Sequence, residues 1–210
     1  VLIGDTSTVK VTGGSAADTI NMAGTLETND VIDGGDGVDT LTMTGATLAT
    51  QFTNVTNVET VAFNEVETAQ AMNVAKLSAG VTKVILDVDD GAAENSGLLA
   101  NTVTGLAGQT VVIRHSESDG SDTTDDDGVQ YTITNATDTA ADSISLELDG
   151  IGTGSSGSTA TNFGVNEIDV NAFETVNIAS NTNSIATVRA DGTTAVAAVG
   201  AITLNTLDPL

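Results

Sequence analysis

The stretch DVIDGGDGVDTLTMTG, residues 30–45, decides the fold expected for this chain. Four aspartates and four glycines occupy it, and its second half alternates Thr with Leu and Met. Glycine allows the positive φ angles of a tight turn, and alternation of polar and apolar residues is typical of a strand with one buried face. The stretch therefore predicts a tight acidic turn that leads directly into a β-strand.

The same alternation recurs along the whole chain. Short alternating runs separated by Gly, Asn and Asp predict strands at 7–13, 39–45, 82–88, 109–114, 129–134, 142–148, 174–180 and 201–205. Helical periodicity is scarce, and only the segment 66–80 is expected to hold one or two helical turns, ending at Gly80. The sequence therefore predicts an all-β chain.

The spacing of these strands favours a β-solenoid over a β-sandwich. The apolar strand centres lie 20 to 27 residues apart, at Ile20, Leu41, Val61, Val84, Val111 and Ile133. Strands of a sandwich usually recur every 8 to 12 residues, whereas the longer spacing suits stacked coils that pair with one another. We therefore predict an irregular β-solenoid with parallel, β-helix-like coils of about 20–27 residues.

Two sequence echoes support divergent repeats. The words AADTINM (16–22), GVDTLTM (37–43) and AADSISL (140–146) share one form, and VETVAF (58–63) and FETVNI (173–178) share a second. Each word ends in the alternation that predicts a strand. The echoes therefore indicate that equivalent positions recur from coil to coil.

The charge balance excludes several functions. The chain has 29 acidic and 5 basic residues among 210, a formal net charge of −24, and yet 40% hydrophobic residues. So much negative charge argues against binding to nucleic acid or to anionic membranes, and no apolar run approaches the length of a membrane span. Since the basic side chains cannot pair with most of the carboxylates, a divalent cation is expected to neutralise some of them.

The residues of common enzyme sites are missing from the sequence. It has no Cys, no HExxH motif, no Walker loop and a single histidine, His115, so a zinc pair or a thiol nucleophile cannot be assembled. The aromatic platforms of sugar-cleaving sites are also scarce. We expect core or seam packing for Phe52, Phe63, Phe163 and Tyr131. We therefore predict a protein that is not an enzyme.

The glycine-rich turn is the strongest candidate site. GGDGVDTL (34–41) fits the calcium-binding nonapeptide pattern G-G-x-G-x-D-x-U, and GGSAADTI (13–20) has the same frame 21 residues earlier. Calcium takes six to eight oxygen ligands, more than one turn supplies, so two stacked turns are expected to share an ion. The candidate ligand positions are Asp30, Asp33, Gly34, Gly35, Asp36, Gly37 and Asp39, together with Gly13, Gly14 and Asp18. The alternative is a pair of plain tight turns in which aspartate makes local hydrogen bonds.

Two further acidic segments are weaker candidates for calcium. LDVDDGAAEN (86–95) offers Asp87, Asp89 and Asp90 beside a glycine turn. SESDGSDTTDDDGVQ (116–130) offers Asp119, Asp122, Asp125 and Asp127, although it lacks the spacing of an EF-hand. The second segment is expected to be a solvated loop, with a calcium site at an interface with another copy as the alternative.

The domain organisation follows from composition. We expect a calcium-binding solenoid block over 1–150, a flexible Gly/Ser/Thr loop over 151–162, and further coils of the same domain over 163–210. The chain begins with Val and shows no signal peptide, so we expect it to be a piece of a longer secreted protein.

The glycine-rich turns resemble RTX-type calcium-binding repeats. Phrases such as NVTNVETVAF, LSAGVTKVILDV and AADSISLELDG resemble the calcium-dependent surface-layer (S-layer) proteins of Gram-negative bacteria that leave the cell by type I secretion. A true RTX roll repeats its nonapeptide many times, whereas this chain has about one and a half such turns, which favours a wider, irregular solenoid.

The resemblance implies a structural role outside the cell. It implies a solenoid held by Ca²⁺ that self-assembles into a lattice on the cell surface. The partners expected are further copies of the chain and a cell-surface polysaccharide. An RTX-type adhesin segment and the accessory solenoid of a secreted hydrolase stay open as alternatives.

Overall fold

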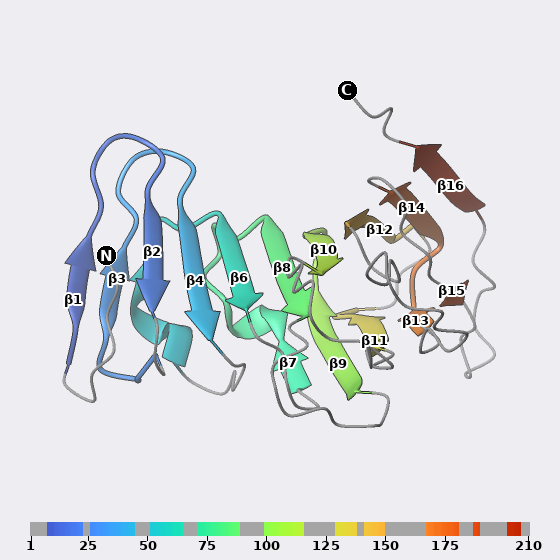
Figure 1. The fold of residues 1–210 in the computed structure, drawn as a ribbon, viewed down its shortest axis with the longest axis horizontal. Helices are drawn as coiled ribbons and strands as arrows, with labels where there is room; N and C mark the ends of the chain where they lie inside the picture. The colour runs from blue at the N-terminus through green and yellow to red at the C-terminus, as the bar shows by residue number, and fades with distance from the viewer. Residues whose placement is uncertain are drawn as a thin grey trace, which may run out of the picture.

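The protein is all-β. A computed structural model describes residues 8–22, 26–44, 51–64, 71–88, 99–115, 129–137, 141–149, 167–180, 187–189 and 201–206. Strands dominate these residues, and the only helical elements described are two short 3₁₀ helices, Gln51–Asn54 (η1) and Val74–Lys76 (η2). Neither has the length and apolar character needed to cross a membrane. The prediction of an all-β chain is confirmed (Figure 1).

The described strands form three sheets, and all of their pairings are parallel. The large sheet has eight strands in the order β16-β14-β12-β10-β8-β6-β4-β2. They are Thr19–Met22 (β2), Thr40–Thr44 (β4), Thr60–Asn64 (β6), Lys83–Val88 (β8), Thr110–His115 (β10), Ser143–Asp149 (β12), Thr175–Ser180 (β14) and Ala201–Thr206 (β16). A three-stranded sheet contains Lys10–Thr12 (β1), Val31–Asp33 (β3) and Val55–Thr56 (β5). A five-stranded sheet contains Ala71–Asn73 (β7), Leu99–Leu106 (β9), Val129–Asn135 (β11), Glu167–Asn171 (β13) and Thr187–Arg189 (β15).

The chain alternates between the large sheet and the two smaller ones. Each strand of the large sheet pairs with the strand two places earlier in the sequence, and β1, β3 and β5 do the same. We call the passage from one strand of the large sheet to the next a circuit. One buried core joins the sheets, since Leu41 of the large sheet, Ile32 of the three-stranded sheet and Val103 of the five-stranded sheet belong to the same cluster. The smaller sheets therefore cover one face of the large sheet.

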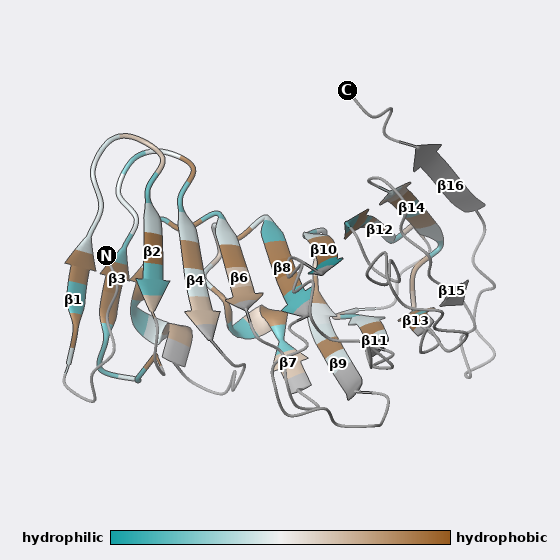
Figure 2. Cartoon of the chain, in the orientation of Figure 1, coloured by the Kyte–Doolittle hydropathy of each residue, from teal (hydrophilic) through white to brown (hydrophobic). Residues whose placement is uncertain are grey.

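The register of the large sheet aligns one apolar residue from each strand with an apolar residue of the next strand; we call this row the column. Neighbouring positions on successive strands are Ile20, Leu41, Val61, Val84, Val111, Leu146, Ile178 and Leu204. The first five are the predicted strand centres, and all five are buried. Polar and apolar residues alternate along β4 in Figure 2, as expected for a strand with one buried face.

The sixth predicted centre, Ile133, is wrong for this column. Ile133 lies on β11 of the five-stranded sheet, between Val103 and Val170, and Leu146 follows Val111 in the large sheet. The circuit from Val111 to Leu146 spans 35 residues and the next, from Ser143 to Thr175, spans 32, both longer than predicted. Alternation reveals that a strand has one buried face, but it does not reveal which sheet the strand joins.

Three of the four aromatic residues expected to be buried are described by the structure, and they lie where the sequence predicts. Phe52, Phe63 and Tyr131 are buried, while Phe163 lies outside the described residues. Phe173, on the loop before β14, is also buried. In the segment expected to be helical, the described residues form β7 and the 3₁₀ helix η2, in which the Asn73 side chain accepts a hydrogen bond from the Ala75 N–H.

Glycine is required where one turn lies on the next. A Cβ added to Gly34 would collide with the carbonyl oxygen of Asn57, and a Cβ added to Gly13 would collide with that of Gly34. Gly35 and Gly37 adopt φ angles of +93° and +137°, which other residues rarely adopt. Close stacking of the turns thus explains much of the glycine pattern.

This stacking predicts a strong effect of Gly34→Ala. Because the new methyl group would push against backbone, the free energy of unfolding should fall by about 1–3 kcal/mol. Gly80→Ala is the matched control, since its Cβ would meet only ordinary contacts of 3.6 Å or more, and it should change stability by about 0.5 kcal/mol or less. Urea unfolding of both variants in excess chelator measures the difference. Equal effects would contradict the stacking explanation.

Candidate metal centre

The two glycine-rich turns are stacked, as predicted. The Gly13 N–H donates to the Asp33 carbonyl oxygen at 2.7 Å, and the Asp36 N–H donates to that of Gly14 at 2.9 Å. The Thr40 N–H donates to the Asp18 carbonyl oxygen at 2.9 Å. The turn at 13–18 therefore lies directly against the turn at 34–39, and both lead into strands of the large sheet, β2 and β4.

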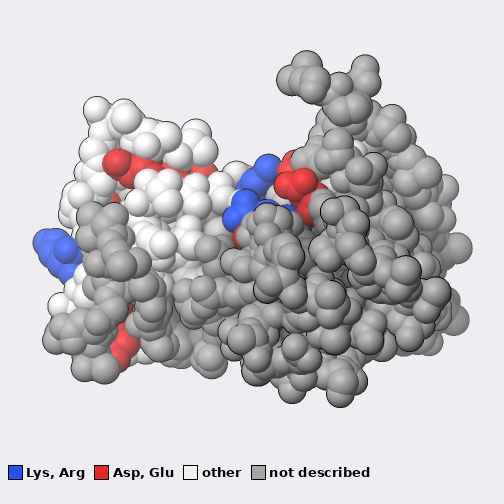
Figure 3. Space-filling view, viewed as in Figure 1, with Lys and Arg blue, Asp and Glu red and all other residues white. Residues whose placement is uncertain are grey.

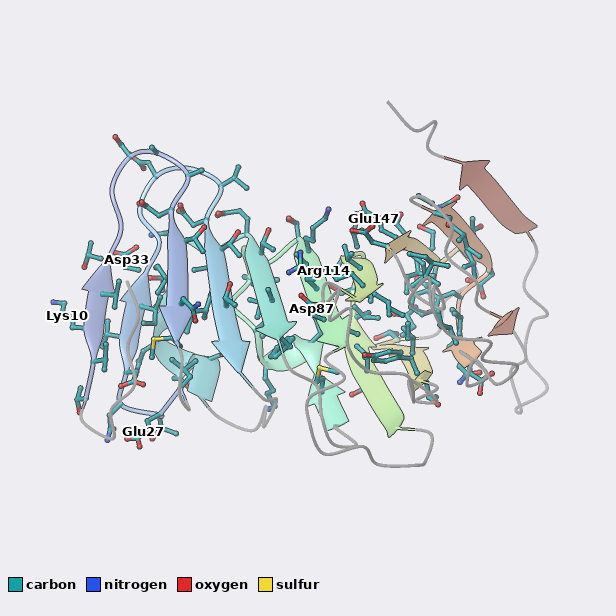
Figure 4. All side chains as sticks on the ribbon, viewed as in Figure 1. Lys10, Glu27, Asp33, Asp87, Arg114 and Glu147 are labelled. Atoms are coloured by element: carbon teal, nitrogen blue, oxygen red, sulfur yellow. The ribbon has the colours of Figure 1, made fainter. Side chains whose placement is uncertain are left out.

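Asp30 lies apart from these turns. It precedes β3, whereas the turn at 34–39 follows it, so the two are separated by the length of the strand. Asp30 is buried, and its Oδ1 and Oδ2 accept hydrogen bonds of 2.8 Å from the N–H groups of Val9 and Glu27. Figure 4 shows Glu27 and Asp33 well separated. The backbone thus supplies a partner to each carboxylate oxygen of Asp30.

Asp33 joins the turn to the following circuit. Its Oδ1 accepts a hydrogen bond of 3.2 Å from the Gly35 N–H and another of 2.8 Å from the Asn57 side-chain amide. Asn57 has a φ of +51°, a left-handed conformation that asparagine tolerates better than most residues. Asp33 therefore fixes both the turn that follows it and the turn stacked next to it.

Asp18 and Asp39 occupy the same place in the two turns but differ in their partners. The Asp18 Oδ2 accepts a hydrogen bond of 2.6 Å from the Gly14 N–H. In the second turn the equivalent N–H, that of Gly35, points to Asp33 instead. Asp39 Oδ1 accepts from the Asp18 N–H at 2.7 Å, but Asp39 Oδ2 is buried and has no hydrogen-bond partner.

The unpartnered oxygen lies inside the second turn. A Cβ built on Gly34 would be 2.7 Å from Asp39 Oδ2, so the carboxylate rests against the Gly34 backbone. The Asp39 side chain is 0% exposed. A buried carboxylate oxygen without a partner is costly, and this position is therefore the one in the two turns that is best suited to a cation.

Sequence reasoning missed Glu59, which lies at the equivalent position of the next circuit. Glu59 directly precedes β6, and its Oε2 accepts a hydrogen bond of 2.8 Å from the Asp39 N–H. Glu174 makes the same contact with the Asp142 N–H at 2.7 Å. Neither glutamate lies in a glycine-rich turn, but both belong to the VETVAF and FETVNI echo, which was the available signal.

Asp87 has a counter-ion from the protein itself. This buried residue on β8 accepts a hydrogen bond of 2.7 Å from Arg114 Nε on β10. Figure 4 labels the two side chains on their neighbouring strands. The other candidates of the two acidic segments, Asp89, Asp90, Asp119, Asp122, Asp125 and Asp127, lie outside the described residues. Within the described ranges, no three His, Cys, Asp or Glu side chains converge as a metal-binding group.

The negative charge of Asp87 contributes to the raised pKa of Tyr131. The Tyr131 hydroxyl is buried and has no hydrogen-bond partner. Burial of the phenol, followed by the negative charge of Asp87, raises the pKa of Tyr131 well above its usual value. The phenol therefore stays neutral in the folded protein.

Comparison with known proteins gives no relative for this site. No protein-family model, no curated protein and no solved structure matches the chain significantly.

An alkaline titration tests the environment of Tyr131. The chain has one tyrosine, so tyrosinate absorbance reports this residue alone. In the unfolded chain the phenol ionises near pH 10, and the folded protein resists this ionisation because its pKa is raised. The free energy of unfolding should therefore fall as the pH rises above about 10, and tyrosinate should appear together with the loss of β-structure. Ionisation near pH 10 in a fully folded protein would contradict the buried environment, and Tyr131→Phe should remove this absorbance change.

Proposed function

We propose that this chain is a calcium-stabilised β-solenoid that serves as a structural, non-enzymatic segment of a bacterial surface layer. The proposal joins three parts: the architecture of the chain, the binding of Ca²⁺ in the stacked turns, and assembly with further copies outside the cell. The observation that carries it is the buried Asp39 Oδ2, which has no hydrogen-bond partner in a glycine-rich turn.

The solenoid architecture is supported by the regular alternation between sheets. Every described pairing is parallel, and each strand of the large sheet follows the one before it in sequence order. Parallel strands joined by circuits of 20 to 35 residues stack without long crossings. A stack of this kind is elongated and presents repeated surfaces, which suits a building block of a layer.

Calcium is supported by the oxygen chemistry of the second turn. Asp39 Oδ2 is a hard ligand in a site where the backbone passes close by, and calcium commonly completes its shell with backbone carbonyls and water. The Gly14 carbonyl and the Asp36 and Asp18 carboxylates belong to the same pair of turns. An ion here would provide a partner for the Asp39 oxygen and would offset part of the charge of −24.

The stabilisation expected from such ions is substantial. Extracellular calcium modules bind with dissociation constants of about 10⁻⁴–10⁻³ M. At a calcium concentration about 100 times the dissociation constant, one site adds roughly 2.7 kcal/mol to the free energy of unfolding. The low calcium of a cytoplasm would leave the chain less stable before export than after it.

The calcium proposal is tested by matched carboxylate substitutions. Saturating Ca²⁺ should raise the thermal midpoint of the parent protein by roughly 5–10 °C relative to chelator, and equal Mg²⁺ should do less. Asp39→Asn should abolish this shift because it removes the charged ligand. Asp30→Asn is the control: it removes the same charge where both oxygens already have backbone partners, so it should lower stability in chelator but keep the shift. A shift that survives Asp39→Asn would overturn the proposed site.

Sedimentation velocity of the same samples tests the structural role. Calcium should convert the parent protein into large assemblies, and two-dimensional arrays should be visible by electron microscopy. A protein that stays monomeric in calcium and binds a surface polysaccharide would contradict the layer and favour the adhesin.

A further inference from the structure

One position of the large sheet is repeatedly acidic. The residue immediately before the strand is Asp18 for β2, Asp39 for β4, Glu59 for β6, Asp142 for β12 and Glu174 for β14. These five residues come from circuits of different length, and only Asp18 and Asp39 lie in glycine-rich turns. What they share is their position, directly before the first residue of a strand of the large sheet.

At two places the contact between neighbouring circuits is reciprocal. The Asp39 N–H donates to Glu59 Oε2 at 2.8 Å, and the Glu59 N–H donates back to the Asp39 carbonyl oxygen at 3.2 Å. The Asp142 N–H donates to Glu174 Oε2 at 2.7 Å, and the Glu174 N–H donates back to the Asp142 carbonyl oxygen at 3.0 Å. The same pair of bonds therefore closes circuits of 20 and 32 residues.

Asp39, from the first of these pairs, also contacts the preceding circuit. The Asp18 N–H donates to Asp39 Oδ1 at 2.7 Å, so Asp39 accepts from one circuit while its own N–H donates to the next. In each case the carboxylate belongs to the later circuit and the N–H to the earlier one. Because an N–H just before a strand has no strand partner, a carboxylate there satisfies it with a charge-assisted hydrogen bond.

We propose that the carboxylates of Asp39, Glu59 and Glu174 form a register lock between circuits. At β4, β6 and β14 the lock ties the start of the strand to the start of the preceding strand of the large sheet, whatever the length of chain between them. Without it, a strand can slip along its neighbour, and a slip of one residue would turn the buried side chains outward. The proposal concerns the protein's own hydrogen bonds and does not depend on calcium.

The middle of the large sheet is tied differently. The residues before β8 and β10 are Thr82 and Gln109, which carry no carboxylate. Here the described ion pairs join the strands instead: Arg114 on β10 pairs with Asp87 on β8, and Lys83 on β8 reaches Glu147 on β12 at 2.9 Å. Figure 3 shows basic and acidic side chains gathered in this region. The locks thus lie toward both ends of the stack, and side-chain pairs lie between them.

Amide hydrogen exchange in excess chelator tests the lock. Glu59→Ala should raise the exchange rate of the Asp39 amide about 10-fold or more, because that N–H loses a charged acceptor. Glu59→Gln, which keeps an acceptor oxygen of the same reach, should raise it less. The amide of Val111, in the middle of the sheet, should be unaffected. An unchanged Asp39 amide in Glu59→Ala, or an equal rise at Val111, would overturn the proposal.

Cross-linking provides a direct readout of register, since the chain has no cysteine of its own. Thr42 and Ala62 are neighbours on β4 and β6, whereas Thr42 and Thr60 would become neighbours only after a two-residue slip. The pair Thr42→Cys and Ala62→Cys should form a disulfide readily in the otherwise unchanged protein. Adding Glu59→Ala should reduce this disulfide and increase the one between Thr42→Cys and Thr60→Cys. Unchanged yields of both disulfides would contradict the lock, and Glu174→Ala, which leaves β4 and β6 intact, is the control.

Discussion

The structure depends on the register that neighbouring strands of the large sheet keep with one another. Parallel strands form evenly spaced, slanted hydrogen bonds, and the strands β2 to β14 of the large sheet bury one face. A shift by one residue would therefore exchange the buried and exposed side chains along the whole strand. The buried column that contains Leu41, Val61 and Val84 exists only because this alignment is kept over circuits of unequal length.

Several features of the turns are consequences of that constraint. Gly34 lacks a side chain where the Asn57 carbonyl oxygen crosses it, and Asp33 holds the Asn57 amide. Glycine and aspartate are thus required here by stacking alone, before any ion is considered. The feature that stacking does not explain is Asp39 Oδ2, because the equivalent oxygen of Asp18 accepts a hydrogen bond from the Gly14 N–H.

The sequence predicts the strands better than it predicts their contacts. Alternation located β4, β8, β10, β12 and β14 within a residue or two, because a half-buried strand leaves that pattern whatever its partners. Ile133 was counted in one series with the strand centres of the large sheet, although it lies in the five-stranded sheet, because both layers bury the same kind of side chain. The stacking of Gly13 on Gly34 was predictable because two similar turns lie one circuit apart.

Glu59 was not predicted because its role depends on a partner 20 residues away and on no local motif. The sequence echo marked Glu59 and Glu174 as equivalent, but an echo does not state what the residues bind. The same limit applies to Asp87, which has the local sequence of a metal ligand and the structure of an ion pair with Arg114. The residue type and its sequence neighbours indicate which contacts a side chain could make. The register of the strands determines which partner lies within reach and therefore which contact forms.

Hydrogen bonds from backbone N–H groups to carboxylates help to explain how the chain folds with so large a negative charge. A carboxylate that accepts a backbone N–H has part of its charge compensated by the peptide dipole, so it stabilises a stack without a basic partner. Asp30, Glu59 and Glu174 are used in this way. A chain built on such contacts can hold few lysines and arginines and still fold. The acidic composition is then in part a property of how the circuits are joined. Asp39 differs from these three residues, because it accepts a backbone N–H with one oxygen and leaves the other without a partner.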